Sequence, residues 1–533
     1  MTPIGGMDEL TLNTPTDFVI ACAGVGSRMH EVNKLLHKGL LSYQNKPIIY
    51  HLINQIPSQF RLVFLVGHLS NQIRDFVELS FPERESVFVE VTDYASVNSG
   101  TATSLQQAQE ILSKSFWYAP CDGIFGPEIE VLLQNIGDEN VFFGADTQLV
   151  SQLNQYCLFE QRDSRITNIH YKSDRNSGLF NDETLVFTGL MFIHDKSLYF
   201  QNLKSVGLSE FVHAIPLGAN VKEVGLWKDF GTPAEYFKHL REDQVFDFSK
   251  PNEVTYLTER KVIKWWSDLS ISSKKLEKPK IKPDAYPGGL VQKGQFLMYE
   301  KVKGSVMYSM LTPQLFHTFL NWLSTSFWDR TNVDISTSLD SFYVEKSKSR
   351  IELIKQHLPY VFEEAFYDTF GNKLIPSEVL EGFSWNLLNQ DVVVSNIHGD
   401  LQFDNVIVTD QQEFCLIDWR SEFGNELVLG DIYYDLAKLY GGMLIDYSRI
   451  KRGEFSFNLK DGVYSFSFHS CPNFEEITSI FRAFIESQSL SWRKTVLLTS
   501  LIFLNMCPLH ERPFSDILFF KSLEMMRNYS DDS

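Results

Sequence analysis

Strand-like and helix-like segments alternate along the first 240 residues, and this alternation restricts the fold more than any other feature. Short apolar runs alternate with stretches of helical character, and helical crossovers between strands favour a parallel, layered sheet. We therefore expect an α/β, Rossmann-like domain with a mainly parallel sheet at 17–240, after a loose leader at 1–16. The expected strands are 18–23, 62–67, 87–92 and 116–119, and the expected helices are 47–56, 70–79 and 102–112.

The remainder of the chain has a different pattern. A polar stretch at 241–252 predicts a linker, and 253–303 reads as a small strand-rich lobe. From 304 to 530 the sequence is mostly helical, with a strand-and-loop region at 392–419. A small β lobe followed by a larger helical lobe is typical of a two-lobed, kinase-like α+β domain. Two large domains agree with a length of 533 residues.

Composition favours a cytoplasmic protein that acts on small molecules. The net charge of −19 excludes a general nucleic-acid binder, because phosphate backbones need dense basic surface. The six cysteines form no C-x-x-C pair, so we expect buried, reduced thiols and no zinc site. The start of the chain lacks a signal-peptide pattern, and the longest apolar run, 496–506, suits a buried helix without membrane insertion. A homo-oligomer is compatible with all of this.

A glycine-rich turn follows the first expected strand. Backbone N–H groups from Ala23, Gly24, Gly26 and Ser27 are expected to bind phosphates, because glycines let the backbone approach closely. Arg28 adds a permanent charge for phosphate oxygens.

Two lysines downstream make the pattern specific. Lys38 begins Lys-Gly-Leu-Leu, and Lys46 precedes Pro47 at the start of an expected helix. With 24–28, these segments resemble the signature of the sugar-phosphate nucleotidyltransferases, which include phosphocholine cytidylyltransferases and thymidylyl- and uridylyltransferases. The resemblance extends over 17–240 and implies that Arg28 and Lys38 are catalytic.

The same resemblance implies further site residues. In 99–102, Gly100 and Thr101 match the loop that lies against the nucleobase. Asp122 and the Asp229 of Trp-Lys-Asp-Phe-Gly-Thr-Pro match the two aspartates that hold Mg²⁺. Lys172 matches the lysine that binds the acceptor phosphate, although Tyr replaces the usual glutamate before it, and a solvated surface lysine is the alternative.

The second site is indicated by His-Gly-Asp-Leu-Gln-Phe-Asp-Asn at 398–405, followed by Leu-Ile-Asp-Trp at 416–419. Asp400 can orient an acceptor hydroxyl and receive its proton. Asn405 and Asp418 offer oxygen ligands to Mg²⁺ bridging the phosphates of ATP. His398 is expected to brace the loop. The pattern resembles the aminoglycoside phosphotransferase and choline kinase superfamily, and 430–438 resembles its following helix, whose aspartates organise the loop.

The nucleotide contacts of the small lobe carry a weaker signal. Lys264 in Val-Ile-Lys-Trp resembles the lysine that binds ATP phosphates, with Lys261 as the rival. Glu300 lies in a segment, 298–304, that resembles the hinge whose backbone holds the purine. No glycine-rich loop precedes Lys264, and 254–257 lies in its place.

These resemblances imply a bifunctional enzyme that phosphorylates a small alcohol with ATP and then transfers a nucleotidyl group, with CTP favoured over UTP, dTTP and GTP. Mg²⁺ would serve both sites. Similar fusions occur in bacterial surface-polysaccharide loci, which suggests a capsule or lipopolysaccharide precursor. Two alternatives stay open: an independent, detoxifying kinase, and a catalytically dead domain that regulates its neighbour.

Overall fold

The chain forms two compact units in a computed structural model. One unit comprises Met1–Leu269 with Val291–Met298, and the other comprises Ser270–Leu290 with Tyr299–Ser533. The expected leader and most of the expected linker lie outside the described residues. The structure describes residues 17–29, 32, 34–96, 100–134, 137–172, 183–206, 211–243, 252–383 and 385–530.

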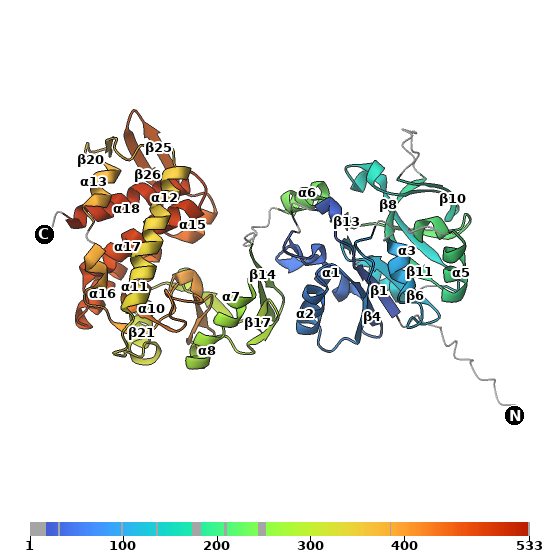
Figure 1. The fold of residues 1–533 in the computed structure, drawn as a ribbon, viewed down its shortest axis with the longest axis horizontal. Helices are drawn as coiled ribbons and strands as arrows, with labels where there is room; N and C mark the ends of the chain where they lie inside the picture. The colour runs from blue at the N-terminus through green and yellow to red at the C-terminus, as the bar shows by residue number, and fades with distance from the viewer. Residues whose placement is uncertain are drawn as a thin grey trace, which may run out of the picture. The chain divides into compact units, whose positions relative to one another are not determined.

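A nine-stranded sheet forms the centre of the amino-terminal unit (Figure 1). The expected strands and helices up to residue 119 are all present, although the helix α3 ends at Gln106 and continues as tight turns to Leu112. In spatial order the strands are β5 (Ser86–Glu90), β4 (Arg61–Val66), β1 (Asp17–Cys22), β6 (Phe116–Pro120), β11 (Thr184–Ile193), β8 (Val141–Asp146), β12 (Asn220–Val224), β10 (Arg165–His170) and β9 (Leu158–Arg162).

The sheet is mixed, so the expectation of a mainly parallel sheet holds only for its first half. Strands β5, β4, β1 and β6 run parallel, whereas β11 is antiparallel to both β6 and β8. The reversal arises at the hairpin β9–β10, where Asp163 and Ser164 both have positive φ, 50° and 59°. A two-residue turn of this kind can join only antiparallel strands.

Both faces of the sheet are covered. Phe18 and Ile20 of β1 belong to one buried core together with residues of α1 (Ile48–Gln55) and α2 (Ser70–Ser80). Val19 belongs to the opposite core, which includes residues of α3 (Thr101–Gln106) and α5 (Lys196–Val206). The period of two along β1 follows from strand geometry, and it produces a three-layer α/β domain.

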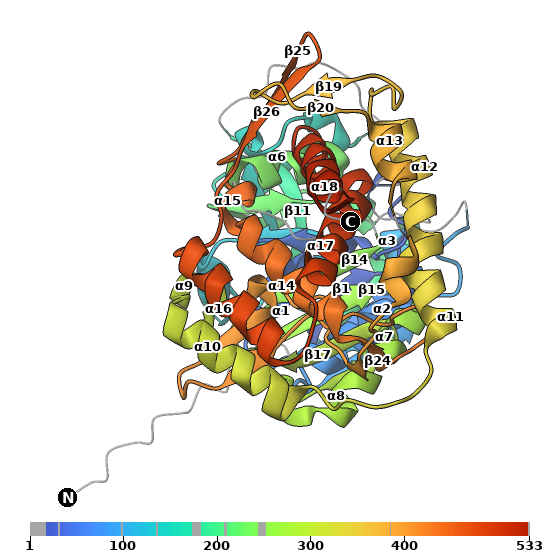
Figure 2. The ribbon, with the colours of Figure 1, turned by 90° about the vertical axis from the view of Figure 1, so that its left-hand side faces the viewer.

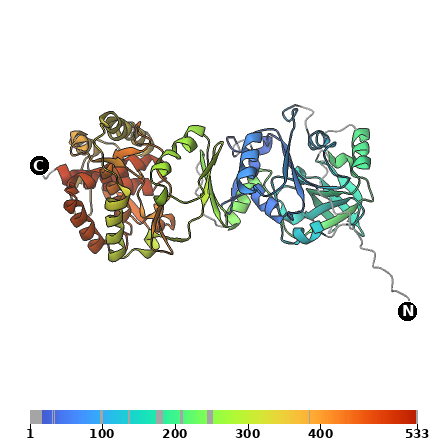
Figure 3. The same cartoon turned by 90° about the horizontal axis from the view of Figure 1, so that it is seen from below.

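A second, smaller sheet packs against the first of these cores. The Tyr256 and Phe296 rings lie 5.9 and 6.1 Å from the Phe76 ring of α2, and the Tyr256 hydroxyl donates to the Leu40 carbonyl. Figures 1 and 3 show its yellow-green strands beside the blue helices. Its strands, in order, are β14 (Glu253–Leu257), β15 (Lys261–Trp266), β17 (Phe296–Glu300) and β16 (Val291–Lys293).

The expected small lobe at 253–303 is therefore divided between the two compact units. The apolar side chains of Ile263 and Trp265 are buried in the amino-terminal core. For this reason most of the small sheet belongs to the amino-terminal unit. Lys264 lies between them in sequence and so points to the opposite face of β15.

The carboxy-terminal unit is mostly helical, as expected. Helices α14 (Ile432–Leu444), α17 (Trp492–Met506) and α18 (Phe514–Ser530) lie together at its centre (Figure 2). The apolar run at 496–506 lies within α17, which is buried as predicted. None of the helices within the described ranges is long and apolar enough to cross a membrane. All six cysteines are buried, as expected, and none of them forms a disulfide in the structure.

The packing of the small sheet makes a prediction about stability. Trp265→Ala should destabilise the amino-terminal unit by roughly 3–5 kcal/mol, because it removes a fully buried ring from that core. Hydrogen exchange in β1 and β4 is the measurement. Phe481→Ala, an equally buried aromatic of α16 (Phe474–Ser487), is the matched control and should accelerate exchange only in the carboxy-terminal unit. Unchanged exchange in β1 and β4 of Trp265→Ala would refute the assignment.

Candidate active sites

A buried ion pair lies at the centre of the amino-terminal site. The Lys38 Nζ is 2.7 Å from the Asp122 Oδ2, and the two side chains are only 18% and 7% exposed. Burial alone would lower the pKa of Lys38, but the Asp122 carboxylate outweighs burial and raises it. Burial likewise opposes ionisation of Asp122, and Lys38 nevertheless holds its pKa below the ordinary value. Both groups are therefore charged at neutral pH.

The second expected aspartate lies beside the first. Asp229 ends β13 (Trp227–Asp229), and it is paired across the ladder with Gly123 of β7 (Gly123–Phe125). The Asp122 Oδ2 and the Asp229 Oδ1 both lie 3.2 Å from the point that a Cβ on Gly231 would occupy. These two oxygens are therefore no further apart than twice that distance. The absence of a side chain at Gly231 leaves the space between them open.

The environment of Asp229 differs from that of Asp122. Burial, and then the neighbouring Asp122 charge, raise the pKa of Asp229 to about 6. The Tyr156 hydroxyl donates to the Asp229 Oδ2 at 2.6 Å. The sequence analysis did not identify Tyr156, because it lies outside the motifs and its role depends on tertiary contact.

The glycine-rich turn follows β1 as expected. Gly26 has φ 67°, in the left-handed region that glycine adopts without strain, and a single 3₁₀ turn follows at Ser27–Met29. A Cβ on Gly24 would meet no described atom within 4 Å, so the backbone there is accessible. Arg28 is exposed, and its charge favours the ionised forms of Asp122 and Asp229, although the pKa of Asp229 remains raised overall. The positive charge of Arg28 therefore acts on the carboxylate pair.

A buried histidine fixes the position of Lys38. The His37 Nδ1 accepts from the Gly39 N–H at 3.1 Å, and its Nε2 lies 2.8 Å from the Cys22 carbonyl at the end of β1. Because a carbonyl only accepts and an amide N–H only donates, the ring is neutral with its proton on Nε2. Burial lowers the pKa of His37 to about 4, in agreement. The sequence analysis missed His37.

Three other expected residues have less defined roles. Gly100 and Thr101 begin α3, where the Gly100 N–H donates to the Thr103 Oγ1 at 2.9 Å; Ser99 lies outside the described residues. Lys172 is exposed just after β10, and no contact joins it to Asp122 or Asp229 in the described part of the chain.

The chemistry of the aspartate pair fits Mg²⁺. Two carboxylates with open space between them suit an ion that keeps several water and phosphate ligands. Within the described ranges, no three or more His, Cys, Asp or Glu side chains come together in a way that could hold a metal ion. A metal at the aspartate pair would therefore need water or phosphate as further ligands.

The carboxy-terminal site also contains a lysine–aspartate pair. The Asp400 Oδ1 is 2.8 Å from the Lys438 Nζ of α14 and accepts from the Gln402 amide at 2.9 Å. Burial opposes ionisation, but Lys438 holds the pKa of Asp400 well below its usual range. The Asp400 side chain is 34% exposed, so an incoming group can reach it.

Asn405 and Asp418 lie near this pair at one end of a hairpin. The Asn405 amide donates to the Asp400 carbonyl at 2.8 Å and to the Asp400 Oδ2 at 3.4 Å, which leaves its own oxygen as the group for a cation. Strands β22 (Val406–Thr409) and β23 (Phe414–Leu416) pair antiparallel, so Asp418 follows the strand opposite Asn405. Asp418 has φ 60°, which is costly for a residue with a side chain.

The backbone of the loop at 398–405 is held by Asp435. Its carboxylate accepts from the backbone N–H groups of His398 and Gly399 at 2.9 and 2.7 Å, and from the Trp328 indole at 3.2 Å. The His398 Nε2 lies 2.8 Å from the Ile417 carbonyl. The expectations that His398 braces the loop and that an aspartate of 430–438 organises it are both confirmed.

The expected nucleotide contacts lie in different units. Lys264 is buried in β15, whereas its rival Lys261 donates from Nζ to the Leu79 carbonyl at 3.2 Å. Glu300, in the carboxy-terminal unit, donates its backbone N–H to the Gly288 carbonyl. A cleft of about 1040 Å³ is lined by Glu300, by the following residues 301–303 and by Phe414 and Cys415 of β23.

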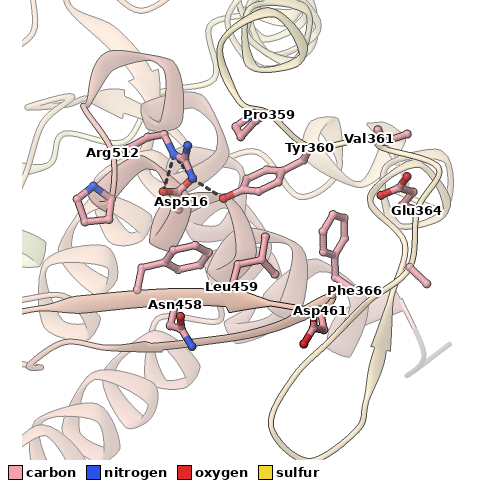
Figure 4. A pocket seen from close by; sticks show the side chains of 14 residues that line it. Pro359, Tyr360, Val361, Glu364, Phe366, Asn458, Leu459, Asp461, Arg512 and Asp516 are labelled. Atoms are coloured by element: carbon pink, nitrogen blue, oxygen red, sulfur yellow. Dashed lines mark hydrogen bonds and ion pairs between the residues drawn. The ribbon is translucent and has the colours of Figure 1, made fainter.

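Another cavity, of about 670 Å³, lies between the hairpin β25 (Ser456–Lys460) and β26 (Val463–Ser467) and the start of α18. Figure 4 shows Tyr360 and Arg512 both directed at Asp516, with bonds of 2.5 Å from the Tyr360 hydroxyl and 2.9 Å from the Arg512 Nε. The Asp516 carboxylate thus already has its hydrogen-bond and ion-pair partners within the protein.

One family match includes the second of the two motifs, at 398–405. The phosphotransferase enzyme family matches residues 367–456. The bifunctional protein GlmU of Methanococcus maripaludis is 28% identical over 118 residues, which cover 22% of this chain and 27% of that protein. The chain thus spans about a quarter of the length of this relative.

Two solved structures are similar to the chain. The inositol-1-phosphate CTP transferase from T. maritima has 14% identity and a TM-score of 0.35, covering 43% of this chain and 96% of its own. HddC from Yersinia pseudotuberculosis has 15% identity and a TM-score of 0.33, covering 43% and 99%.

The chain is thus an α/β protein with two enzyme-like parts. The carboxy-terminal unit contains a kinase-like domain of the phosphotransferase enzyme family. The amino-terminal region resembles the sugar-phosphate nucleotidyltransferases, on the motifs at 24–28 and 227–233.

The contacts of Asp435 predict a large effect on folding. Asp435→Ala should lower the free energy of unfolding by about 3 kcal/mol or more, because three buried N–H donors lose their acceptor. Urea denaturation of the carboxy-terminal unit is the measurement. Asp410→Ala, on an exposed turn in the same unit, should change the value by no more than about 0.5 kcal/mol. Similar losses in the two variants would contradict this role.

Proposed function

We propose that the chain is a bifunctional enzyme that phosphorylates a small alcohol with ATP and then transfers CMP from CTP to the resulting phosphate. The observation that carries the proposal is a separate lysine–aspartate centre in each unit, Lys38 with Asp122 and Lys438 with Asp400. Each ion pair keeps a carboxylate charged beside a residue suited to Mg²⁺, which phosphate chemistry requires.

In the kinase step, Asp400 orients the acceptor hydroxyl and receives its proton. The acceptor oxygen forms a bond to the γ-phosphorus of ATP while the bond to the ADP oxygen breaks. Asn405 and Asp418 would hold Mg²⁺, which when bound neutralises phosphate charge. Lys264 is assigned to the ATP phosphates, and the backbone at Glu300, beside the 1040 Å³ cleft, to the purine.

In the nucleotidyl step, an oxygen of the new phosphate attacks the α-phosphorus of CTP and pyrophosphate leaves. Arg28 and Lys38 stabilise the negative charge that develops. Asp122 and Asp229 would hold Mg²⁺ in the space beside Gly231.

Other residues of the amino-terminal unit bind the two substrates in this proposal. Backbone N–H groups of Ala23, Gly24, Gly26 and Ser27 bind triphosphate oxygens, and Lys172 binds the acceptor phosphate. Gly100 and Thr101 lie against the base. CTP is preferred on the sequence resemblance to phosphocholine cytidylyltransferases, and UTP, dTTP and GTP are the alternatives.

The product would be a nucleotide-activated building block for a surface polysaccharide, made in the cytoplasm where ATP and CTP are available. The alternative is a nucleotidyltransferase with an independent or regulatory kinase-like domain. The charged state of Asp400 beside Lys438 favours an active kinase over a dead regulator.

A substrate matrix tests the proposal. The purified chain is incubated with candidate alcohols, ATP, Mg²⁺ and each nucleoside triphosphate, and products are identified by mass spectrometry. We expect a nucleoside diphosphate joined to the alcohol, together with ADP and pyrophosphate, and no product after chelation of Mg²⁺. Formation of the phosphorylated alcohol with no nucleotide-linked product from any base would exclude the coupled reaction.

Paired variants separate the two centres. Asp400→Asn should abolish ATP-dependent phosphorylation but leave nucleotidyl transfer to a supplied phosphate unchanged. Lys38→Met should lower nucleotidyl transfer by roughly 10²–10³-fold, because it removes one preorganised charge, and leave phosphorylation intact. Both rates are read from the same mass-spectrometric assay, after circular dichroism confirms folding. Loss of both activities in either folded variant would contradict independent sites.

A further inference from the structure

Four basic side chains lie on segments near the proposed catalytic base, Asp400. Lys346 and Arg350 lie one turn apart on α12 (Lys346–His357), and Lys438 projects from α14. Arg420 follows the Asp418 loop. All four belong to the carboxy-terminal unit. We call Lys346, Arg350 and Arg420 the cationic cluster, since Lys438 already pairs with Asp400.

Contacts place Arg420 directly beside the base. A Cβ added to Gly399 would lie 2.7 Å from the Arg420 Cβ and 3.2 Å from its Cδ, so the arginine stem covers the residue that precedes Asp400. The Arg420 N–H also donates to the His398 carbonyl at 3.0 Å. The loop that carries Asp400 and the base of the Arg420 side chain thus form one surface.

An aromatic ring joins Arg420 to α12. The Lys346 Nζ lies 4.1 Å from the centre of the Phe342 ring, and the Arg420 Cζ lies 4.8 Å from it. Burial, followed by the charges of Arg420, Lys438 and Arg350, lowers the pKa of Lys346 to about 6. Lys346 is therefore mostly uncharged at neutral pH, and a bound anion would favour its protonated form.

The cluster has no acidic counterpart. Lys346, Arg350 and Arg420 form no ion pair with any residue that the structure describes, and Asp400 is already paired with Lys438. The whole chain carries a net charge of −19, so two unpaired arginines together with a lysine that an anion would protonate are unlike the rest of the protein. Mutual repulsion disfavours this arrangement unless an anion binds there.

The two oxygens of Asp400 indicate which substrate that anion belongs to. Asp400 Oδ2 lies toward Asn405, at 3.4 Å, on the side assigned to ATP and its Mg²⁺. Asp400 Oδ1 lies toward Lys438, at 2.8 Å. The ring of Tyr434, one turn before Lys438 on α14, lies 4.9 Å from the Phe342 ring that Lys346 and Arg420 both contact. The cluster is therefore on the side of the base that is left for the acceptor.

We propose that the acceptor alcohol carries a second, anionic group, a carboxylate or a phosphate, which the cationic cluster binds. This inference rests on the proposed kinase function and narrows its substrate class. The anion orients the alcohol so that its hydroxyl meets Asp400; the hydroxyl proton goes to Asp400, and the oxygen takes the γ-phosphoryl group from ATP. Neutral polyols lack the recognised group, and cationic amino alcohols are repelled.

Matched acceptors test the charge requirement on the wild-type chain. ADP release is measured with glycerol, glycerate, glycerol 3-phosphate and choline, and with glucose, glucuronate and glucose 6-phosphate. We expect kcat/KM for an anionic member to exceed that of its neutral counterpart by about 100-fold, since two charge-assisted contacts are each worth about tenfold or more. Glycerate and glucuronate against the phosphate esters distinguish a carboxylate from a phosphate.

Variants assign the effect to the cluster. Lys346→Gln with Arg350→Gln should raise the KM for the preferred anionic acceptor by about 100-fold and leave the KM for ATP unchanged. Lys348→Gln with Lys355→Gln removes the same charge from exposed positions of α12 and should leave both values unchanged. If the cluster variant does not fold, the wild-type acceptor series decides alone.

The remaining outcomes are distinguishable. A neutral or cationic alcohol as the best acceptor, or Asp400-dependent ADP release that no anionic alcohol accelerates, overturns the inference while the kinase stands. A rise in the KM for ATP in the cluster variant assigns these cations to the nucleotide and also overturns it. ADP release that Asp400→Asn does not alter refutes the proposed kinase function itself.

Discussion

Each site depends on a carboxylate that stays ionised in a poorly solvated position because a lysine ammonium lies within 2.8 Å of it. Without the lysine, burial would favour the neutral acid, which neither accepts a proton nor attracts a metal ion. The lysines also explain the local architecture. Lys38 is presented by a 3₁₀ turn and Lys438 by a long buried helix, so different folds reach the same electrostatic solution.

The two sites also share a way of holding their loops. In both, a buried neutral histidine accepts the backbone N–H two residues ahead through Nδ1 and reaches a carbonyl through Nε2. Burial lowers the pKa of His37 and of His398 to about 4, so neither ring charges at neutral pH. A neutral ring with a fixed tautomer accepts one backbone N–H and donates to one carbonyl at the same time. It therefore holds the loop in place beside the charged pair without adding a charge of its own.

Sequence reasoning was most successful where chemistry is concentrated in motifs. The strand ends carrying Asp122 and Asp229 meet because antiparallel pairing of β7 with β13 brings them together, and the loop from His398 to Asn405 is local. Tyr156 and His37 were missed, because each acts through a contact that only the tertiary fold creates. The antiparallel course of β11 was also missed, since strand periodicity carries no information on direction.

The two faces of the β14–β15 hairpin differ in what they pack against. Ile263 and Trp265 are part of the amino-terminal core, while Lys264 points away from it. Substitutions at Ile263 and Trp265 are therefore constrained by packing in the amino-terminal core. Recombination between relatives at the polar segment near residue 245 would separate Tyr256 and Trp265 from the core in which they pack. The natural exchange point for such chimeras lies beyond β17.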